Sequence, residues 1–126
     1  MFSSRRLRLA VRIGTLTFVI YMISALFLYR VTSPATAYFD HLAEAFLHGR
    51  LFLINPPSTV DLTFYQGQWY LPFPPLPALL LLPFVAIVGA TGVNTVIFGA
   101  VMGAINVVIA FLLLEALAQQ CWTQLS

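Results

Sequence analysis

Residues 13–29 read IGTLTFVIYMISALFLY, a continuous apolar run without a charged side chain. In a helix this run would measure about 25 Å, close to the roughly 30 Å of hydrocarbon in a bilayer. Arg12 and Arg30 flank it, and long arginine side chains can reach the two membrane surfaces. The run therefore predicts a first membrane-spanning helix.

The composition of the whole chain points the same way. Of its 126 residues 60% are hydrophobic and only 8% are charged, which is unusual for a water-soluble domain. A basic groove with aromatic or polar partners, as nucleic acids require, is missing from the sequence, so we expect no nucleic-acid partner. The single cysteine, Cys121, allows no internal disulfide.

Four arginines precede the first apolar run, and positive residues next to a first span are retained in the cytoplasm. These are Arg5, Arg6, Arg8 and Arg12. We therefore expect residues 1–12 to form a cytoplasmic amino terminus and the protein to lie in a bacterial inner membrane. A cleaved signal peptide ending at Ala35-x-Ala37 is the alternative, although the apolar run is longer than a usual signal core.

Two further apolar segments follow, and they predict a second span over residues 72–89 and a third over residues 94–114. The short link between them predicts that the third span returns antiparallel beside the second. Gly99 and Gly103 on the third span form a small-residue face that suits close contact with another helix. Residues 115–126 are a polar tail without Lys or Arg, which three spans would place outside the cell.

Residues 30–71 have the composition of a folded exterior loop. Ser33-Pro34 and Gly49 are typical of a helix start and a helix end, which predicts a membrane-parallel helix over residues 34–48. Aromatic residues on both sides of Gln66-Gly67 predict a small β-hairpin. The predicted fold class is therefore an all-α membrane protein with about three transmembrane helices, an amphipathic interfacial helix and a small hairpin.

The polar side chains of the loop helix are the candidates for chemistry. At 100° per residue Asp40, His41, Glu44 and His48 share one arc, where two carboxylates and two imidazoles could act as acid or base or hold a charged substrate. Ordinary solvation of an interfacial helix explains the same arc. Asp61 could equally be a turn residue, and Asn106 in the third span requires a hydrogen-bond partner.

Known site motifs give no further candidate. His41, Glu44 and His48 could converge on a metal, but their spacing is not that of the HExxH motif. The sequence contains no phosphate-binding glycine loop, no nucleophile elbow and no cysteine-based metal motif. We therefore expect neither a cofactor nor a bound metal.

The order of these parts resembles the amino-terminal portion of polytopic GT-C glycosyltransferases, which include protein O-mannosyltransferases and aminoarabinose transferases of lipid A. Residues 39–50, FDHLAEAFLHGR, resemble the family's membrane-parallel helix after an exterior acidic residue, of the type A-x-x-L-x-x-G. Residues 73–77, FPPLP, resemble the element that opens the family's second span. The resemblance covers about residues 1–115.

The resemblance implies an enzyme that takes a sugar from a lipid-linked phosphate donor on the extracytoplasmic face of the membrane. It implies Asp40 as the catalytic carboxylate, with Glu44 as the second candidate. His41, His48 and Arg50 are then candidates for substrate binding.

Two expectations concern the extent and class of the protein. Members of the group have many more spans, so we expect this chain to be an amino-terminal fragment that is inactive alone. The alternative class is a non-enzymatic accessory or assembly subunit that binds a larger membrane partner through the face of Gly99 and Gly103 and through the exterior loop. Membrane lipids are expected partners in either class.

Overall fold

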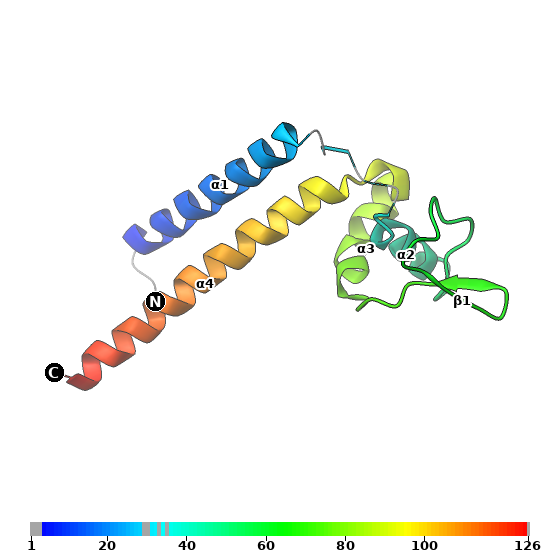
Figure 1. Cartoon of the computed structure of the whole chain (residues 1–126). Coiled ribbons are helices and arrows are strands. Elements are labelled where there is room, and N and C mark those ends of the chain that lie inside the picture. Colours follow the sequence, from blue (N-terminus) through cyan, green and yellow to red (C-terminus); the bar gives the residue numbers. More distant parts are fainter. Residues whose placement is uncertain (1–3, 29–30, 33, 35, 126) are drawn as a thin grey trace. The chain divides into compact units, whose positions relative to one another are not determined.

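The structure is a computed structural model and describes residues 4–28, 31–32, 34 and 36–125. The described part is mostly helical, and its elements in chain order are α1 (Ser4–Phe27), α2 (Phe39–Leu47), β1 (Thr63–Tyr65), β2 (Gln68–Tyr70), α3 (Leu76–Val88), the 3-10 helix η1 (Ala90–Gly92) and α4 (Thr95–Leu125) (Figure 1). The predicted end of the first span at Tyr29 and Arg30, the predicted helix cap Ser33 and the signal-peptide residue Ala35 lie outside the described residues.

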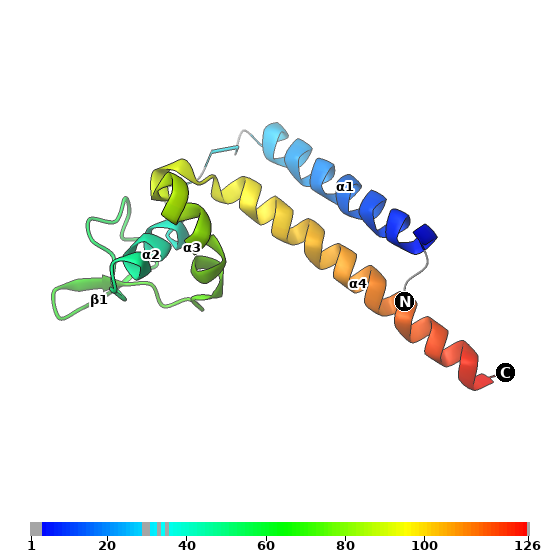
Figure 2. The same ribbon diagram turned by 180° about the vertical axis from the view of Figure 1, so that it is seen from behind.

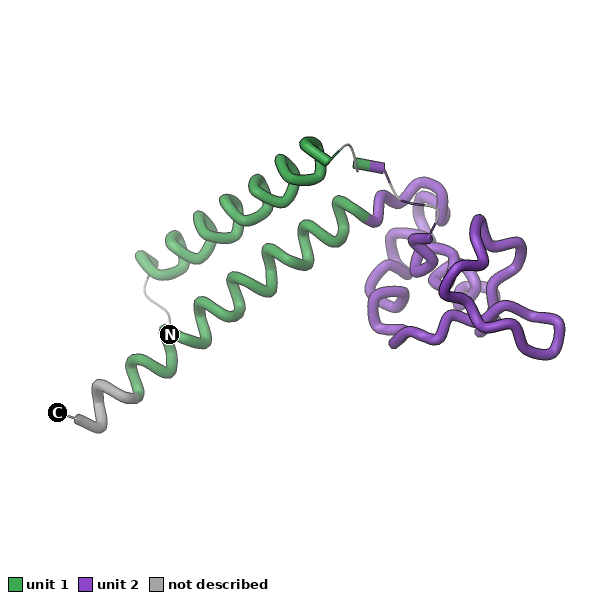
Figure 3. The backbone as a smooth tube through the Cα atoms, viewed as in Figure 1, with its two compact units in different colours: residues 1–31, 96–126 green, residues 32–95 purple. Residues whose placement is uncertain are grey.

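The chain divides into two compact units, shown in Figure 3. One unit contains residues 1–31 and 96–126, which form α1 and most of α4. The other contains residues 32–95, with α2, the two strands, α3 and η1. Each unit is described below by itself.

In the first unit α1 and α4 lie side by side and run in opposite directions, as Figure 1 and the reverse view in Figure 2 show. Arg6 near the start of α1 forms an ion pair with Glu115 late in α4, with Nε and Oε2 3.4 Å apart. Farther along α1, a Cβ on Gly14 would lie 2.7 Å from Cγ2 of Val108. Residues later in α1 contact residues earlier in α4, so the two helices are antiparallel.

Both helices are long and apolar enough to cross a membrane, over Ser4–Phe27 and Thr95–Gln120. These stretches of 24 and 26 residues correspond to about 36 and 39 Å of helix. Of their most apolar windows only 6% and 11% are buried inside the protein. The core helix of a water-soluble protein would be mostly buried, so most of this apolar surface has no cover within the chain.

The small-residue face of α4 lies against α1 at one of its two glycines. A Cβ on Gly103 would collide with the ring of Tyr21 on α1, whereas a Cβ on Gly99 would meet nothing within 4 Å. Ala100 and Ala104 of α4 are buried. Gly103 is therefore the glycine of this face that leaves room for the Tyr21 ring of α1.

In the second unit α2 packs against α3 and η1. The two helices contribute buried apolar residues to this small core: Leu42, Ala43 and Ala45 from α2 and Ala78, Leu81 and Val85 from α3. Ala43 and Ala78 have no exposed surface, and small side chains let helices approach closely. This core holds the first turn of α2 next to η1.

The predicted second span is a helix of only 13 residues, α3, and measures about 20 Å. It is too short to match the roughly 30 Å of a bilayer core by itself. Pro72, Pro74 and Pro75 explain the late start, since a residue before proline avoids helical dihedral angles. Gly89, with φ +76°, ends the helix.

The predicted hairpin is present. Thr63 pairs with Tyr70, Phe64 with Trp69 and Tyr65 with Gln68 in an antiparallel register. Gln66 and Gly67 both have positive φ, +48° and +78°, as the two-residue turns with primed geometry require. The rings of Phe64 and Trp69, with centroids 4.7 Å apart, add a cross-strand contact.

The loop helix is shorter than predicted, because α2 begins at Phe39 and not at Pro34. Ahead of it the Ala37 amide donates to the Pro34 carbonyl, which closes a turn that is not continued into the helix. The predicted end is confirmed. Gly49 has φ +68°, its amide donates to the Phe46 carbonyl, and the Arg50 amide donates to the Ala45 carbonyl, as in a Schellman motif.

Candidate functional site

The candidate site lies at the amino-terminal end of α2, where Asp40 occupies the first turn. An acidic residue is favoured there, since the first amides of a helix have no partner within the helix and carry partial positive charge. Asp40 Oδ1 accepts a hydrogen bond of 2.8 Å from the His41 amide. The carboxylate is thus held in place by the helix that carries it.

Asp40 is buried, with 6% of its surface exposed. Its neighbours on the predicted polar arc differ from it, since His41 is half-buried and Glu44 and His48 are exposed. Membership of the shared polar arc therefore does not predict the burial of Asp40. The 100° period places it correctly on the helix, but α2 packs against η1, and residues of that turn line the same pocket as Asp40.

Burial raises the pKa of the Asp40 carboxyl above its ordinary value. The hydrogen bond from the His41 amide and the charge of His41 act in the opposite direction, and the negative charge of Glu44 adds to the increase. Burial outweighs the stabilising contacts, so the carboxyl holds its proton more tightly than an exposed aspartate. A raised pKa of this kind is common at catalytic carboxyls, which work best near the ambient pH.

Asp40 lines a pocket of about 520 Å³ within the second unit. The pocket is lined from four parts of the sequence: the segment before α2, the first turn of α2, the loop after it, and the turn that joins α3 to α4. Polar groups come from Thr32, Asp40, His41, Thr91 and Asn94, and apolar surface comes from Pro34, Pro57 and Val93. Concave sites with a few polar groups on apolar walls are typical of small-ligand binding, and this volume lies within their usual range.

The structure brings together only part of the predicted site. Asp40 and His41 both line the pocket, whereas Glu44, His48 and Arg50 do not. Arg50 is half-buried, and its Nε atom is buried without a hydrogen-bond partner among the described residues. Asp61 is an exposed turn residue with φ +64°, in agreement with the turn interpretation.

The alternative of a metal site on α2 finds no support. Within residues 4–28, 31–32, 34 and 36–125, no three His, Cys, Asp or Glu side chains form a group that could hold a metal ion, so His41, Glu44 and His48 do not converge on one. Of these three side chains, His41 lines the pocket, whereas Glu44 and His48 are exposed.

Sequence reasoning missed the polar residues that line the same pocket as Asp40 from η1 and the residues after it. Thr91 and Asn94 lie about fifty positions after Asp40 and carry no motif. The only signal for them was the short Gly-bounded link between two apolar segments, which predicted a turn but not its neighbour. Only the packing of η1 on α2 relates them to the carboxylate.

Comparisons with known proteins add no homologue to this description. No protein-family model, curated protein sequence or solved structure matches the chain.

Proposed function

We propose that the chain is an integral membrane protein in which α1 and α4 cross the bilayer as an antiparallel pair. Their length and their uncovered apolar surface support this proposal. So do the hydroxyls of α1. Thr15 donates to the Val11 carbonyl and Thr17 to the Ile13 carbonyl, so neither hydroxyl needs water.

The proposed antiparallel crossing implies a topology for the whole chain. The arginines at the start of α1 keep that end in the cytoplasm. The antiparallel pair then brings the end of α4 back to the same side, and residues 32–95, which connect the opposite ends of the two helices, form a unit outside. With α3 too short to count as a span, the carboxyl-terminal tail is cytoplasmic, in contrast to the exterior tail that three spans predict.

We further propose that the exterior unit is part of a GT-C type glycosyltransferase, which transfers a sugar from a lipid-linked donor. The observation that carries this proposal is the buried Asp40 carboxylate in a pocket with hydroxyl and amide groups. Such groups suit a substrate rich in hydroxyls, and the pocket's place in a unit bounded by two spans suits a substrate delivered at the membrane surface.

In the proposed reaction Asp40 acts as the general base. It takes the proton of an acceptor hydroxyl while the acceptor oxygen bonds to the anomeric carbon of the sugar. The bond between that carbon and the phosphate oxygen breaks, and the lipid phosphate leaves with the electron pair. His41, next to the carboxylate, positions it through its amide. Glu44, His48 and Arg50 receive no role, because they do not line the pocket.

Filling the pocket tests this function without touching the carboxylate. Thr91 is exposed at the pocket wall, so Thr91→Trp leaves the small core of α2 and α3 intact and occupies the space next to Asp40. We expect sugar transfer from a lipid-linked donor, assayed in membranes carrying the whole gene product, to fall by about tenfold or more, since misplacing a substrate by an ångström can cost about 100-fold.

The matched control is Thr63→Trp, at an exposed threonine in β1 that does not line the pocket. It should transfer sugar at the parental rate. Equal activity of both variants would mean that the pocket is not used in the reaction.

A second candidate function is that of an accessory subunit that binds a partner helix. The observation that favours it is the face of α4 around Gly99, where a Cβ would meet nothing within 4 Å and where Asn106 is exposed. Polar side chains of this kind pair across helices in membranes. Loss of association with a membrane partner in Gly99→Ile, with sugar transfer absent from the parent, would favour this candidate.

A further inference from the structure

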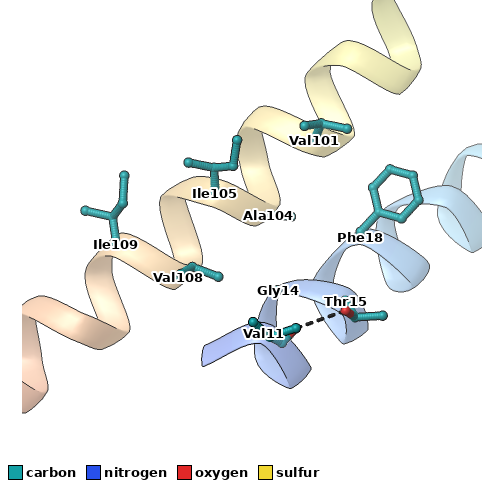
Figure 4. A pocket seen from close by; sticks show the side chains of 9 residues that line it. All are labelled: Val11, Gly14, Thr15, Phe18, Val101, Ala104, Ile105, Val108 and Ile109. Atoms are coloured by element: carbon teal, nitrogen blue, oxygen red, sulfur yellow. Dashed lines mark hydrogen bonds between the residues drawn. The ribbon is translucent and has the colours of Figure 1, made fainter. Parts of the chain in front are cut away.

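The contact between α1 and α4 leaves an apolar groove along one side. Its volume is about 380 Å³, within the range of ligand sites, and its lining is almost entirely apolar. Val11, Thr15 and Phe18 line it from α1, and Val101, Ile105 and Ile109 line it from α4 (Figure 4). The one hydroxyl among them, that of Thr15, already donates to the Val11 carbonyl, as the dashed line in Figure 4 marks.

At one end of the groove every charged side chain is positive except that of Glu115. Arg8 precedes Val11 by three positions, so it continues the stripe of Val11, Thr15 and Phe18 by one helical turn. Arg5, Arg8 and Arg12 are exposed. Arg6 differs, because it forms the ion pair with Glu115 that joins the two helices at this end.

We propose that this groove binds an anionic phospholipid, with one acyl chain along the apolar lining and the headgroup phosphate at Arg8. The inference rests on the proposed membrane crossing of α1 and α4, but not on sugar transfer. Two features select this ligand. Hydrocarbon matches the lining, and a negative headgroup matches the arginines at the end where the bilayer surface would lie.

The acyl chain of a zwitterionic lipid would match the apolar lining, but its headgroup has no net negative charge to pair with Arg8. The experiment therefore varies the charge of the headgroup. The chain is reconstituted in vesicles of phosphatidylcholine with one-fifth phosphatidylglycerol and extracted in mild detergent, and bound lipid is counted by native mass spectrometry. We expect one phosphatidylglycerol per chain, retained in preference to the more abundant phosphatidylcholine.

Two pairs of variants locate the site. Arg8→Gln should lower phosphatidylglycerol retention about fivefold, the effect of one basic residue at a membrane surface, whereas Arg5→Gln, with the same loss of charge about one helical turn farther from the groove, should lower it less than twofold. Ile105→Trp fills the groove and should abolish retention. Leu114→Trp, half a turn around α4 at an exposed position, should leave it unchanged.

Several results would overturn the proposal. Equal retention of the two lipids would exclude headgroup selection, and equal effects of Arg8→Gln and Arg5→Gln would exclude the placement at Arg8. Particles of two chains without lipid would assign the groove to a second copy. Each of these leaves the sugar-transfer proposal standing, whereas a chain that does not insert into vesicles would overturn the lipid site together with the membrane crossing.

Discussion

Asp40→Asn should lower sugar transfer by about 100-fold or more while the protein accumulates normally, because the amide keeps the shape of the carboxylate but cannot accept the acceptor's proton. The measurement is the initial rate of transfer from a lipid-linked donor in membranes with equal amounts of the whole gene product. Glu44→Gln is the control. Glu44 is exposed and outside the pocket, so its variant should keep the parental rate.

The same substitution should stabilise the protein at neutral pH. Burial raises the pKa of Asp40 in the folded state, so the folded protein binds a proton that the unfolded chain has already released. The free energy of unfolding of the parent therefore falls as the pH rises through that raised pKa. Asp40→Asn lacks this decrease, and pH-dependent unfolding in detergent would detect the difference.

Combined loss of activity and gain of stability distinguishes a functional carboxylate from a structural one. Parental activity in Asp40→Asn would contradict the proposed role. Loss of activity in Glu44→Gln alone would move the chemistry one helical turn along α2.

Gly14→Ile should destabilise the α1–α4 pair by about 1–3 kcal/mol, the usual cost of overpacking. A Cβ at this position would lie 2.7 Å from Cγ2 of Val108, and valine has few alternative rotamers with which to make room. Equilibrium unfolding in detergent micelles measures the change. Val108→Ala in the same chain should recover part of the loss, because it removes the colliding methyl group.

Gly99→Ile provides the matched control for this prediction. It introduces the same side chain in place of a helical glycine, but nothing lies within 4 Å of the new Cβ. Its stability should equal or slightly exceed that of the parent, since isoleucine favours a helix more than glycine does. Equal destabilisation by the two variants would mean that α1 and α4 do not pack at Gly14.

Local chemistry explains which parts of the fold could be predicted from the sequence. Apolar runs locate α1 and α4. The turns at Gln66-Gly67 and Gly49 could also be predicted, because they depend only on the dihedral preferences of those residues. The length of α3 and the start of α2 were harder to predict, because prolines and an interrupted turn decide them.

The site was less predictable because it depends on tertiary contacts. The helical period groups Asp40 with Glu44 and His48, but it gives no information on what covers each side chain. Packing of η1 against α2 buries the first of these and leaves the other two exposed. In the same way, the small-residue pattern identified Gly103 as a contact position but not Tyr21 as its neighbour.

The proposed crossing places residues 32–95 on the opposite side of a membrane from the start of α1 and the end of α4, and cysteine labelling tests this topology most directly. Cys121 is the only natural cysteine, and it follows the candidate span of α4. Asp61→Cys adds an exposed thiol in the second unit. In intact cells a membrane-impermeant maleimide should label position 61 at once and Cys121 only after lysis. Labelling of both positions in intact cells, or of Cys121 alone, would contradict the antiparallel two-helix crossing.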